Sequence, residues 1–304
     1  MTESLLIVGG TGFIGGHLAK RAIDCGFKTY VLSLNPPSES QKIQKVEYIQ
    51  ADISNLEELN EKLVITAYDY VVNLSGYVNH SSYLDGGRSV VDCHFNGVQN
   101  LLEVIDWSSL KRFVQIGTSD EYGNHLSPQS EKMPPSPISP YALAKTSSSN
   151  LLQMLYHSEN FPAVILRLFL VYGPNQNNLR FLPQIIKGCI NGDSFPVSAG
   201  NQIRDFCYVE DIIDGILMTF NKNEANGEVI NLASGMPISI KNAIEIVQKI
   251  IGKGGPVFDQ IPYREGENMS LYADITKAKK IINWQPKTSF SIGIKKTIQF
   301  FEKQ

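Results

Sequence analysis

Short apolar segments alternate with segments of helical periodicity along most of the chain. The apolar segments are nearly continuous in Val, Ile and Leu, as expected for strands that are buried on both faces of a parallel sheet. Strand–helix alternation of this kind predicts a doubly wound α/β fold. The predicted strands are "LLIVGG", "TYVLSL", "VEYIQA", "YVVNLSG", "RFVQIGT", "AVILRLFLVYG" and "EVINLAS", and the predicted helices include "FIGGHLAKRAIDCG", "SVVDCHFNGVQNLLEVIDW" and "YALAKTSSSNLLQMLYHSE".

The alternation weakens after about residue 173, where the chain continues with "GPNQNN" and "NGDSFPVSAGNQIRDF" and then a mostly helical C-terminal part. We interpret this region as a smaller lobe that is interleaved with the last strands of the sheet. The predicted larger domain comprises residues 1–172 with 206–234, and the predicted lobe comprises residues 173–205 with 235–304.

Composition and charge exclude several classes of protein. The chain has 304 residues, of which 42% are hydrophobic and 19% charged, and its net charge of −3 includes no basic tail or stripe, so we do not expect nucleic-acid binding. The four widely spaced cysteines form no C-x-x-C or Cys/His zinc pattern and predict buried free thiols in a reducing, cytoplasmic environment. The chain shows no signal-peptide pattern, and "AVILRLFLVYG" is too short to span a bilayer and contains Arg167.

The segment "LLIVGGTGFIGGHLAK" has the sequence of a strand, a glycine turn and a helix. Gly9, Gly12 and Gly15 allow a tight turn and let the backbone approach a pyrophosphate group. The free N–H groups and partial positive charge of the following helix, which begins near Phe13 and Ile14, would bind that group. The position of this motif, at the start of the chain and between a strand and a helix, predicts a dinucleotide site.

The residue after the second strand bears on the choice of cofactor. Dinucleotide folds commonly place Asp or Glu there to bind the adenosine ribose, and this chain has Ser33. A carboxylate would repel a 2′-phosphate and serine does not, which favours NADP(H) over NAD(H). No Arg follows to bind the phosphate, and Lys42 and Lys45 are uncertain substitutes.

Two further strand ends are candidate cofactor contacts. Asp52 could accept a hydrogen bond from the adenine amino group while Ile53 packs against the ring, although Asp52 could equally cap a local turn. At the end of the fourth strand, the small residues around Leu74, Ser75 and Gly76 would let the dinucleotide pass close to the backbone.

The segment "PYALAK" supplies a candidate catalytic pair. Tyr141 and Lys145 are spaced i, i+4 and share one face of a predicted helix, whose first turn suits Pro140. A neighbouring lysine favours the phenolate and should lower the pKa of the tyrosine. Such a tyrosine can give or take a proton while a nicotinamide transfers hydride.

With these motifs in place, the sequence resembles the extended short-chain dehydrogenase/reductases of the nucleotide-sugar epimerase/dehydratase family. The resemblance covers nearly the whole chain and rests on "GGTGFIG", "NLSG", "FNGVQNLLE", "GTSDEYG", "PYALAK", "RLFLVYGP", "IRDFCYVED" and "INWQPKTSF". It implies a Rossmann-type NAD(P) domain and a nucleotide-sugar-binding lobe. It also implies that Thr118 holds the C4 oxygen of the sugar, Tyr141 is the acid/base, Lys145 binds the ribose and Asn96 lies on a supporting helix. Family members are usually homodimers joined by a four-helix bundle, for which the segments 89–107 and 141–157 are the candidates.

The resemblance also indicates residues for the nucleotide sugar. Arg204 in "IRDFCYVED" and Arg264 in "PYREGE" are candidates for the diphosphate, which arginine can bind through a bidentate fork. Glu267 would lie near the nucleoside ribose. Asn178 and Arg180 are candidate contacts from the lobe, and a surface salt bridge remains the alternative for Arg180. Ser75, Tyr77 and His80 follow the fourth strand and could line the sugar pocket.

The polar run after the fifth strand bears on the reaction type. If the strand continues, Thr118 and Asp120 point to one face, and Ser119 and Glu121 to the other. One carboxylate would then share the face of the catalytic hydroxyl. In the family's 4,6-dehydratases a glutamate stands where this chain has the shorter Asp120, so we interpret Asp120 and Ser119 as pocket residues and Glu121 as a solvated one.

The run resembles that of the family's 4-ketoreductases. The first hypothesis is therefore an NAD(P)H-dependent reductase that converts a nucleoside-diphosphate-4-keto-6-deoxyhexose to the 6-deoxyhexose, as in polysaccharide biosynthesis. The alternatives are a nucleotide-sugar 4-epimerase, a 4,6-dehydratase that uses Asp120 and, on the same fold, a non-catalytic nucleotide sensor. The sensor ranks last because Tyr141 and Lys145 are both present.

Overall fold

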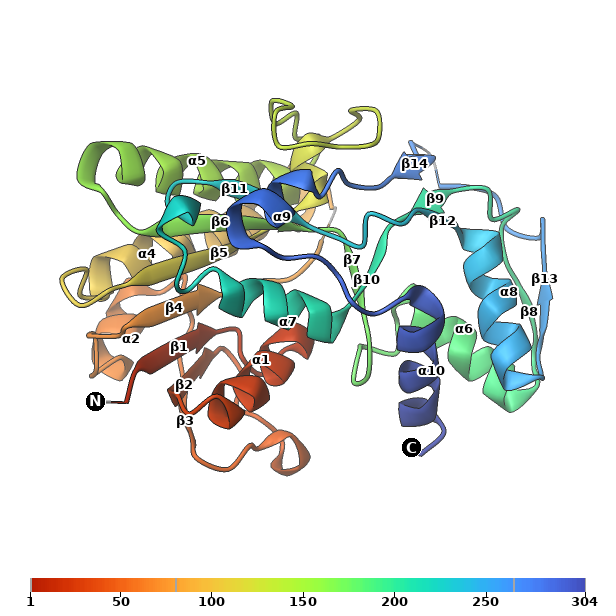
Figure 1. The fold of residues 1–304 in the computed structure, drawn as a ribbon, viewed down its shortest axis with the longest axis horizontal. Coiled ribbons are helices and arrows are strands. Elements are labelled where there is room, and N and C mark those ends of the chain that lie inside the picture. Colours follow the sequence, from red (N-terminus) through yellow and green to blue (C-terminus); the bar gives the residue numbers. More distant parts are fainter. Residues whose placement is uncertain (1, 80, 265, 304) are drawn as a thin grey trace.

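The chain forms a central parallel sheet with helices on both faces and a smaller lobe at one end (Figure 1). The computed structural model describes residues 2–79, 81–264 and 266–303. The main sheet has seven strands in the order β11-β6-β5-β4-β1-β2-β3, and all its neighbouring strands are parallel. The predicted Rossmann-type fold is confirmed. The strands are β1 (Ser4–Val8), β2 (Lys28–Ser33), β3 (Val46–Gln50), β4 (Tyr70–Asn73), β5 (Arg112–Thr118), β6 (Ala163–Leu168) and β11 (Val229–Leu232).

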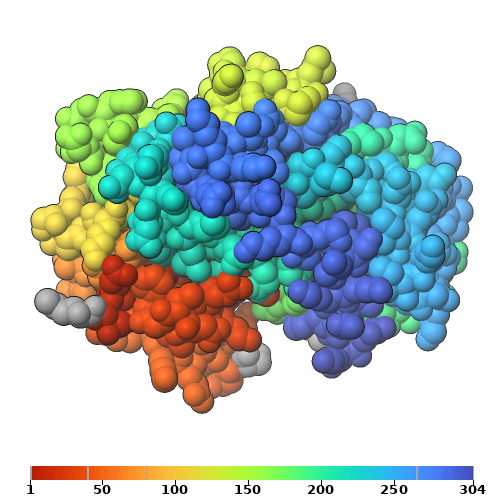
Figure 2. Space-filling model, in the orientation of Figure 1, coloured from red at the N-terminus to blue at the C-terminus, as the bar shows by residue number. Residues whose placement is uncertain are grey.

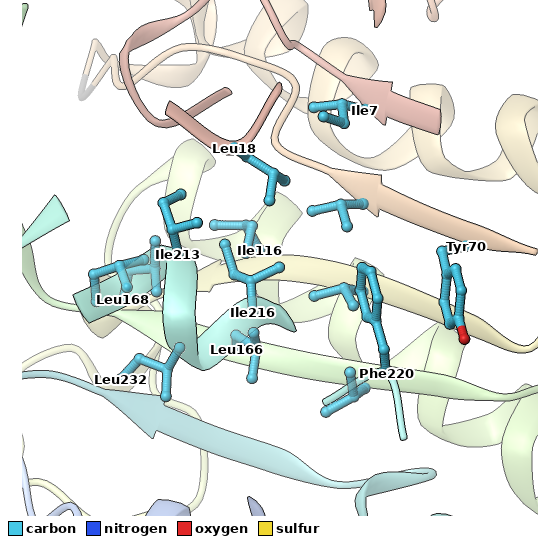
Figure 3. Close-up of a cluster of buried hydrophobic side chains, with 14 of the residues drawn as sticks. Ile7, Leu18, Tyr70, Ile116, Leu166, Leu168, Ile213, Ile216, Phe220 and Leu232 are labelled. Carbon is cyan, nitrogen blue, oxygen red and sulfur yellow. The ribbon is translucent and has the colours of Figure 1, made fainter. Parts of the chain in front are cut away.

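Each face of the sheet has its own apolar core. One face is covered by α1 (Phe13–Asp24), α7 (Val209–Met218) and α9 (Thr276–Ile282), and Figure 3 shows Leu18 of α1 and Ile213 and Ile216 of α7 against the sheet. The other face is covered by α2 (Leu56–Lys62), α4 (Gly97–Val104) and α5 (Pro140–Glu159). Burial on both faces explains why the strands are apolar at nearly every position.

The helices that border the site begin as their sequences predict. The Ser139 hydroxyl accepts a hydrogen bond from the Ala142 N–H, Pro140 occupies the first turn, and Asn160 ends α5 in the left-handed conformation. The predicted helix over 89–107 differs from the expectation. It is divided into α3 (Arg88–Val91), a π-helical turn (Asp92–Asn96) and α4.

The lobe has a third apolar core, formed by α6 (Phe181–Asn191), α8 (Ile240–Ile251) and α10 (Phe290–Phe301). The run "AVILRLFLVYG" divides between β6 in the main sheet and β7 (Leu170–Tyr172), which pairs with β10 (Phe206–Tyr208). The remaining lobe strands are β8 (Ser194–Pro196), β9 (Ile203–Arg204), β12 (Ile238–Ser239), β13 (Gly255–Val257) and β14 (Ser270–Leu271). In Figure 2 the red-to-orange N-terminal part and the blue C-terminal part form one continuous body.

Two details depart from the sequence-based expectations. α9 and Trp284 lie within the range predicted for the lobe, but Ala278, Ile282 and Trp284 pack in the core of the main sheet. The four cysteines are free, but Cys189 and Cys207 are buried whereas Cys25 is exposed and Cys93 is partly buried. No helix in the described part of the chain is long and apolar enough to cross a membrane.

Candidate active site

The glycine turn between β1 and α1 is packed so tightly that it excludes side chains. Gly9 has φ +78, and a Cβ there would lie 2.9 Å from the backbone of Leu74; a Cβ at Gly15 would lie 2.5 Å from the Gly9 carbonyl oxygen. α1 begins at Phe13 after Gly12, and no side chain caps its first N–H groups. Backbone donors of this kind, next to a turn in which three of four residues are glycine, fit a pyrophosphate group. The predicted roles of Gly12, Phe13 and Ile14 stay predictions that this geometry supports.

Ser33 lies at the end of β2, as predicted, but its hydroxyl already has a partner. It is 6% exposed and its Oγ accepts a hydrogen bond from the Thr11 N–H at 3.2 Å. Ser33 therefore holds the glycine turn against β2. This bond to Thr11 explains why a serine occupies the position, so Ser33 is not evidence for a cofactor with a 2′-phosphate.

Asp52 forms the local turn that was one of its two predicted roles. Its Oδ1 accepts hydrogen bonds from the N–H and hydroxyl of Ser54, at 2.9 and 2.7 Å. Ile53 is buried, and its side chain fills the space that a Cβ at Gly97 of α4 would need. The adenine contact of this pair stays a prediction.

The end of β4 is organised by a buried asparagine. Asn73 donates to Gln115 and accepts hydrogen bonds from the N–H and hydroxyl of Ser75. Leu74 continues the pairing with β1 through its N–H and the Val8 carbonyl. Gly76 follows with φ +99, which is a conformation that favours glycine. Leu74, Ser75 and Gly76 thus border the glycine turn, as expected for a cofactor-binding edge.

Tyr141 and Thr118 meet at the carboxyl end of β5. Tyr141 is 7% exposed, and its phenol lies close enough to Thr118 for the threonine side chain to affect its pKa. Burial raises the pKa of Tyr141, the charge of Asp120 raises it further, and the Thr118 side chain opposes both effects. The phenol is therefore harder to ionise than a free tyrosine.

The expected effect of Lys145 on this phenol is not found. Lys145 is buried, its Nζ donates a hydrogen bond to the Ile116 carbonyl at 2.9 Å, and it is not among the groups that shift the pKa of Tyr141. Burial lowers the pKa of Lys145 to about 8, and the charge of Glu121 opposes the fall. The i, i+4 spacing places both side chains on one face, but the lysine extends toward β5. Its bond to Ile116 uses one of three ammonium donors.

The interpretation of the run 118–121 was wrong, because the strand stops at Thr118. Ser119–Tyr122 form a 3₁₀ turn, so strand alternation does not apply to them. Glu121 is fully buried rather than solvated, and its Oε1 accepts the Thr118 N–H at 2.9 Å. Ser119 is also buried, whereas Asp120 is partly exposed. Asp120 acts electrostatically on Tyr141 and is the candidate carboxylate at the phenol.

Asn96 lies on the helical segment that packs against α5, as expected, but His94 of the same turn is the residue next to Tyr141. Asn96 is exposed and donates to Asp92 rather than to the site. His94 is buried instead, with its ring 5.0 Å from the Tyr141 ring in an edge-to-face arrangement. Its Nε2 bonds to the Tyr77 carbonyl, and burial lowers the pKa of His94 to about 3. The π-helical turn rotates the side chains, and no simple helical period predicts this.

The predicted sugar-pocket residues lie around the same edge. Tyr77 is 47% exposed and contributes its carbonyl to His94, while His80 lies outside the described residues. Arg180 is exposed at the start of α6, and its charge lowers the pKa of Tyr141, which places it within electrostatic reach of the phenol. Asn178 is exposed in the preceding loop.

Two of the three residues predicted for the nucleotide part of the substrate, Arg204 and Glu267, form an ion pair with each other. Arg204 in β9 is 9% exposed and forms an ion pair with Glu267. Arg204 also donates to the Ile203 carbonyl, and Arg264 is exposed. The pair joins β9 to the loop before β14. Binding of the nucleotide sugar by Arg204, Arg264 and Glu267 stays a prediction.

Residues 5–233 match the NAD dependent epimerase/dehydratase family. The chain belongs to this family. The family resemblance suggested by the sequence is thereby confirmed, and it places the glycine turn, Thr118 and Tyr141 inside the matched region.

Named relatives share the chain's full length. The UDP-glucuronate 4-epimerase of Thermodesulfobacterium geofontis strain OPF15 is 29% identical over 315 residues, covering 97% of this chain and 95% of the relative. Two solved structures are similar over 99% of both chains. They are UDP-glucose 4-epimerase from Thermotoga maritima with UDP-glucose (TM-score 0.89, 26% identity) and UDP-glucuronic acid 4-epimerase from Bacillus cereus in complex with UDP-glucuronic acid and NAD (TM-score 0.84, 27% identity).

The comparisons do not support the preference for NADP(H). The family is described as NAD dependent, and the similar Bacillus cereus structure contains NAD. The absence of a carboxylate at Ser33 was therefore a poor guide, because this serine serves the glycine turn through Thr11. Among the described residues, no group of three or more His, Cys, Asp and Glu side chains could hold a metal ion.

Proposed function

We propose that the chain is an NAD-dependent nucleotide-sugar 4-epimerase. The observation that carries this proposal is the buried Tyr141 phenol close to Thr118 at the carboxyl end of β5, in a chain whose relatives include named 4-epimerases. The 4-ketoreductase, which was the first hypothesis from the sequence, has less support because the similar proteins carry the names of its alternative. Candidate substrates are UDP-glucuronic acid and UDP-glucose.

Thr118 and Tyr141 have separate roles at C4 of the sugar. Thr118 holds the 4-oxygen and Tyr141 removes the proton of the 4-hydroxyl, then returns it after the sugar has turned. NAD held at the glycine turn and by Lys145 would supply reversible hydride transfer at C4. Lys145 has two ammonium donors beyond its bond to Ile116 for the ribose of the cofactor. Burial of Tyr141 keeps water from the reacting oxygen.

A 4,6-dehydratase is the second candidate, and Asp120 favours it. Its charge acts on Tyr141, so a carboxylate lies near the reacting phenol and could remove the C5 proton. Glu121 cannot serve as that base, since Thr118, Ser149 and Arg167 occupy its oxygens. A dehydratase of this chain would depend on Asp120 alone.

Tyr141→Phe tests the proposed acid/base. We expect kcat to fall at least about a hundredfold, because the substitution removes the proton carrier and keeps the ring that packs on His94. NAD affinity, measured by calorimetry, should change little. Retention of most activity would show that another group carries the proton.

We also propose that the protein forms a homodimer through a four-helix bundle. α5 carries Leu143 and Met154, each 49% exposed, on a helix that also packs against α3. Sedimentation analysis with a double Leu143→Lys/Met154→Lys variant tests this assembly. The proposal requires a dimer in the parent protein and a monomer in the variant.

A further inference from the structure

Glu121 stands at the centre of a buried polar cluster that the proposed reaction does not explain. Its carboxylate is fully buried, and the guanidinium of Arg167 is 3% exposed. Oε1 accepts the Thr118 N–H, and Oε2 accepts the Ser149 hydroxyl and two N–H groups of Arg167. The carboxylate thereby joins three elements: the turn after β5, helix α5 and strand β6.

The backbone makes room for this arrangement. Gly117 and Arg167 are register partners in β5 and β6, and a Cβ at Gly117 would lie 2.5 Å from the Glu121 Oε1. The Arg167 guanidinium also lies over the Tyr122 ring at 4.5 Å. A buried ion pair adds little net stability compared with apolar residues of similar volume, so stability alone does not explain it.

Two partners of Glu121, Thr118 and Ser149, lie next to residues of the proposed site. The Thr118 side chain lowers the pKa of the nearby Tyr141, and Ser149 lies one turn beyond Lys145 on α5. The negative charge also favours the buried Lys145 ammonium. The groups that face Lys145 are Glu121, Cys93 and His94, and Arg167 lies behind Glu121. Glu121 supplies the carboxylate among them.

We propose that Glu121 is a positioning residue, whose carboxylate holds the turn at Thr118 against α5 and β6. The proposal rests on the 4-epimerase function only for its kinetic readout. The pKa of Lys145 is about 8, and burial alone would lower it further, so loss of the Glu121 charge should lower it. A lysine titrates from charged to neutral as pH rises, so the alkaline limb of activity should move to lower pH.

The test uses a double variant, Glu121→Gln/Arg167→Met, which removes both charges and avoids leaving an unpaired arginine in the interior. Arg112→Met is the matched control. Arg112 is equally buried at the opposite end of β5, where it donates to the carbonyls of Thr219 and Lys222. Lys145 is titrated by NMR on protein with ¹³C-labelled lysine, assigned with Lys145→Arg, and kcat and KM are measured over pH.

In the double variant we expect the Lys145 titration and the alkaline limb to shift down by about one unit. We also expect kcat to fall about tenfold at nearly constant KM, since glutamine offers one acceptor oxygen where Thr118 and Ser149 use two, and the Arg167 anchor is gone. The control should show neither change. A folded double variant with an unshifted Lys145, or a control with the same shift, overturns the proposal.

Glu121→Asp covers the case in which the double variant does not fold. It keeps the charge but cannot reach Thr118 and Arg167 together, so Lys145 should titrate as in the parent while kcat falls. Unchanged kcat refutes the positioning role. If the parent protein has no epimerase activity, the NMR titration still decides the inference on Lys145, and the two failures are distinguishable.

Discussion

At the scale of single residues, the chemistry depends on the surroundings of one phenol. Burial and Asp120 raise the pKa of Tyr141, while Thr118 and Arg180 lower it. In the proposed epimerase this phenol is the base at C4, and it lies near a hydroxyl that favours its anion and a carboxylate that disfavours it. Because these opposing effects set the pKa of Tyr141, the dependence of activity on pH should reflect the groups around the phenol.

Asp120→Asn tests this balance. Removing the negative charge makes the phenolate less costly, so the pKa of Tyr141 should fall. Since the deprotonated phenol is the base, the acid limb of kcat/KM should move to lower pH. The profile of kcat/KM over pH measures the shift. Asp106→Asn, in a loop where Asp106 bonds to Ser108, serves as the control with no shift. An unmoved limb in Asp120→Asn would mean that another group limits the rate.

The sequence predicts some of these residues and misleads about others. The glycines, Thr118, Tyr141 and Lys145 follow motifs whose spacing requires their positions. The burial of Glu121 does not follow, because the alternation argument assumed that the strand continued past Thr118. The partner of Glu121 is Arg167, which is 46 residues away, and no local pattern relates the two.

At the scale of elements, the strand–turn–helix unit of β1 and α1 is the predicted cofactor edge. Gly15 lets α1 pack against the turn at Gly9 and Gly10, and a Cβ there would meet their backbone atoms at 2.5 Å. Gly16, the next residue of the same helix, has no atom within 4 Å of the place its Cβ would take. The two glycines form a matched pair.

Gly15→Ala should weaken NAD binding at least about tenfold, because the turn must move away from the helix N-terminus that meets the pyrophosphate. Gly16→Ala should leave NAD binding unchanged and stabilise the protein by up to about 1 kcal/mol, since alanine favours the helix over glycine. Calorimetry and thermal unfolding measure both effects. Equal loss of binding in the two variants would contradict the proposed role of the turn.

The positions of most strands and helices were predictable, because hydrophobic periodicity records which faces are buried. The π-helical turn at Asp92–Asn96 was not, and it places His94 rather than a residue named from the sequence next to Tyr141. The split of "AVILRLFLVYG" into β6 and β7 also depends on tertiary pairing, since β7 pairs with β10 and not with a strand of the main sheet.

At the scale of the whole molecule, the site lies where the main sheet meets the lobe. α1 and α7 are joined by ion pairs of Arg21 with Glu210 and Asp214, and His17 also bonds to Glu210. Phe13, at the start of α1, packs against the core of the lobe. The cofactor edge and the predicted sugar-binding residues are therefore held on one packed body, as a reaction between two bound molecules requires.

The most direct test of the central claim follows the hydrogen at C4. The protein is incubated with NAD and UDP-glucuronic acid or UDP-glucose that carries deuterium at C4, and the products are examined by NMR. The account predicts the C4 epimer with deuterium retained at C4 and no net accumulation of reduced nicotinamide. Loss of water with deuterium at C6 would indicate a dehydratase. No conversion of either sugar, with oxidation of reduced nicotinamide only on a 4-keto sugar, would contradict the account.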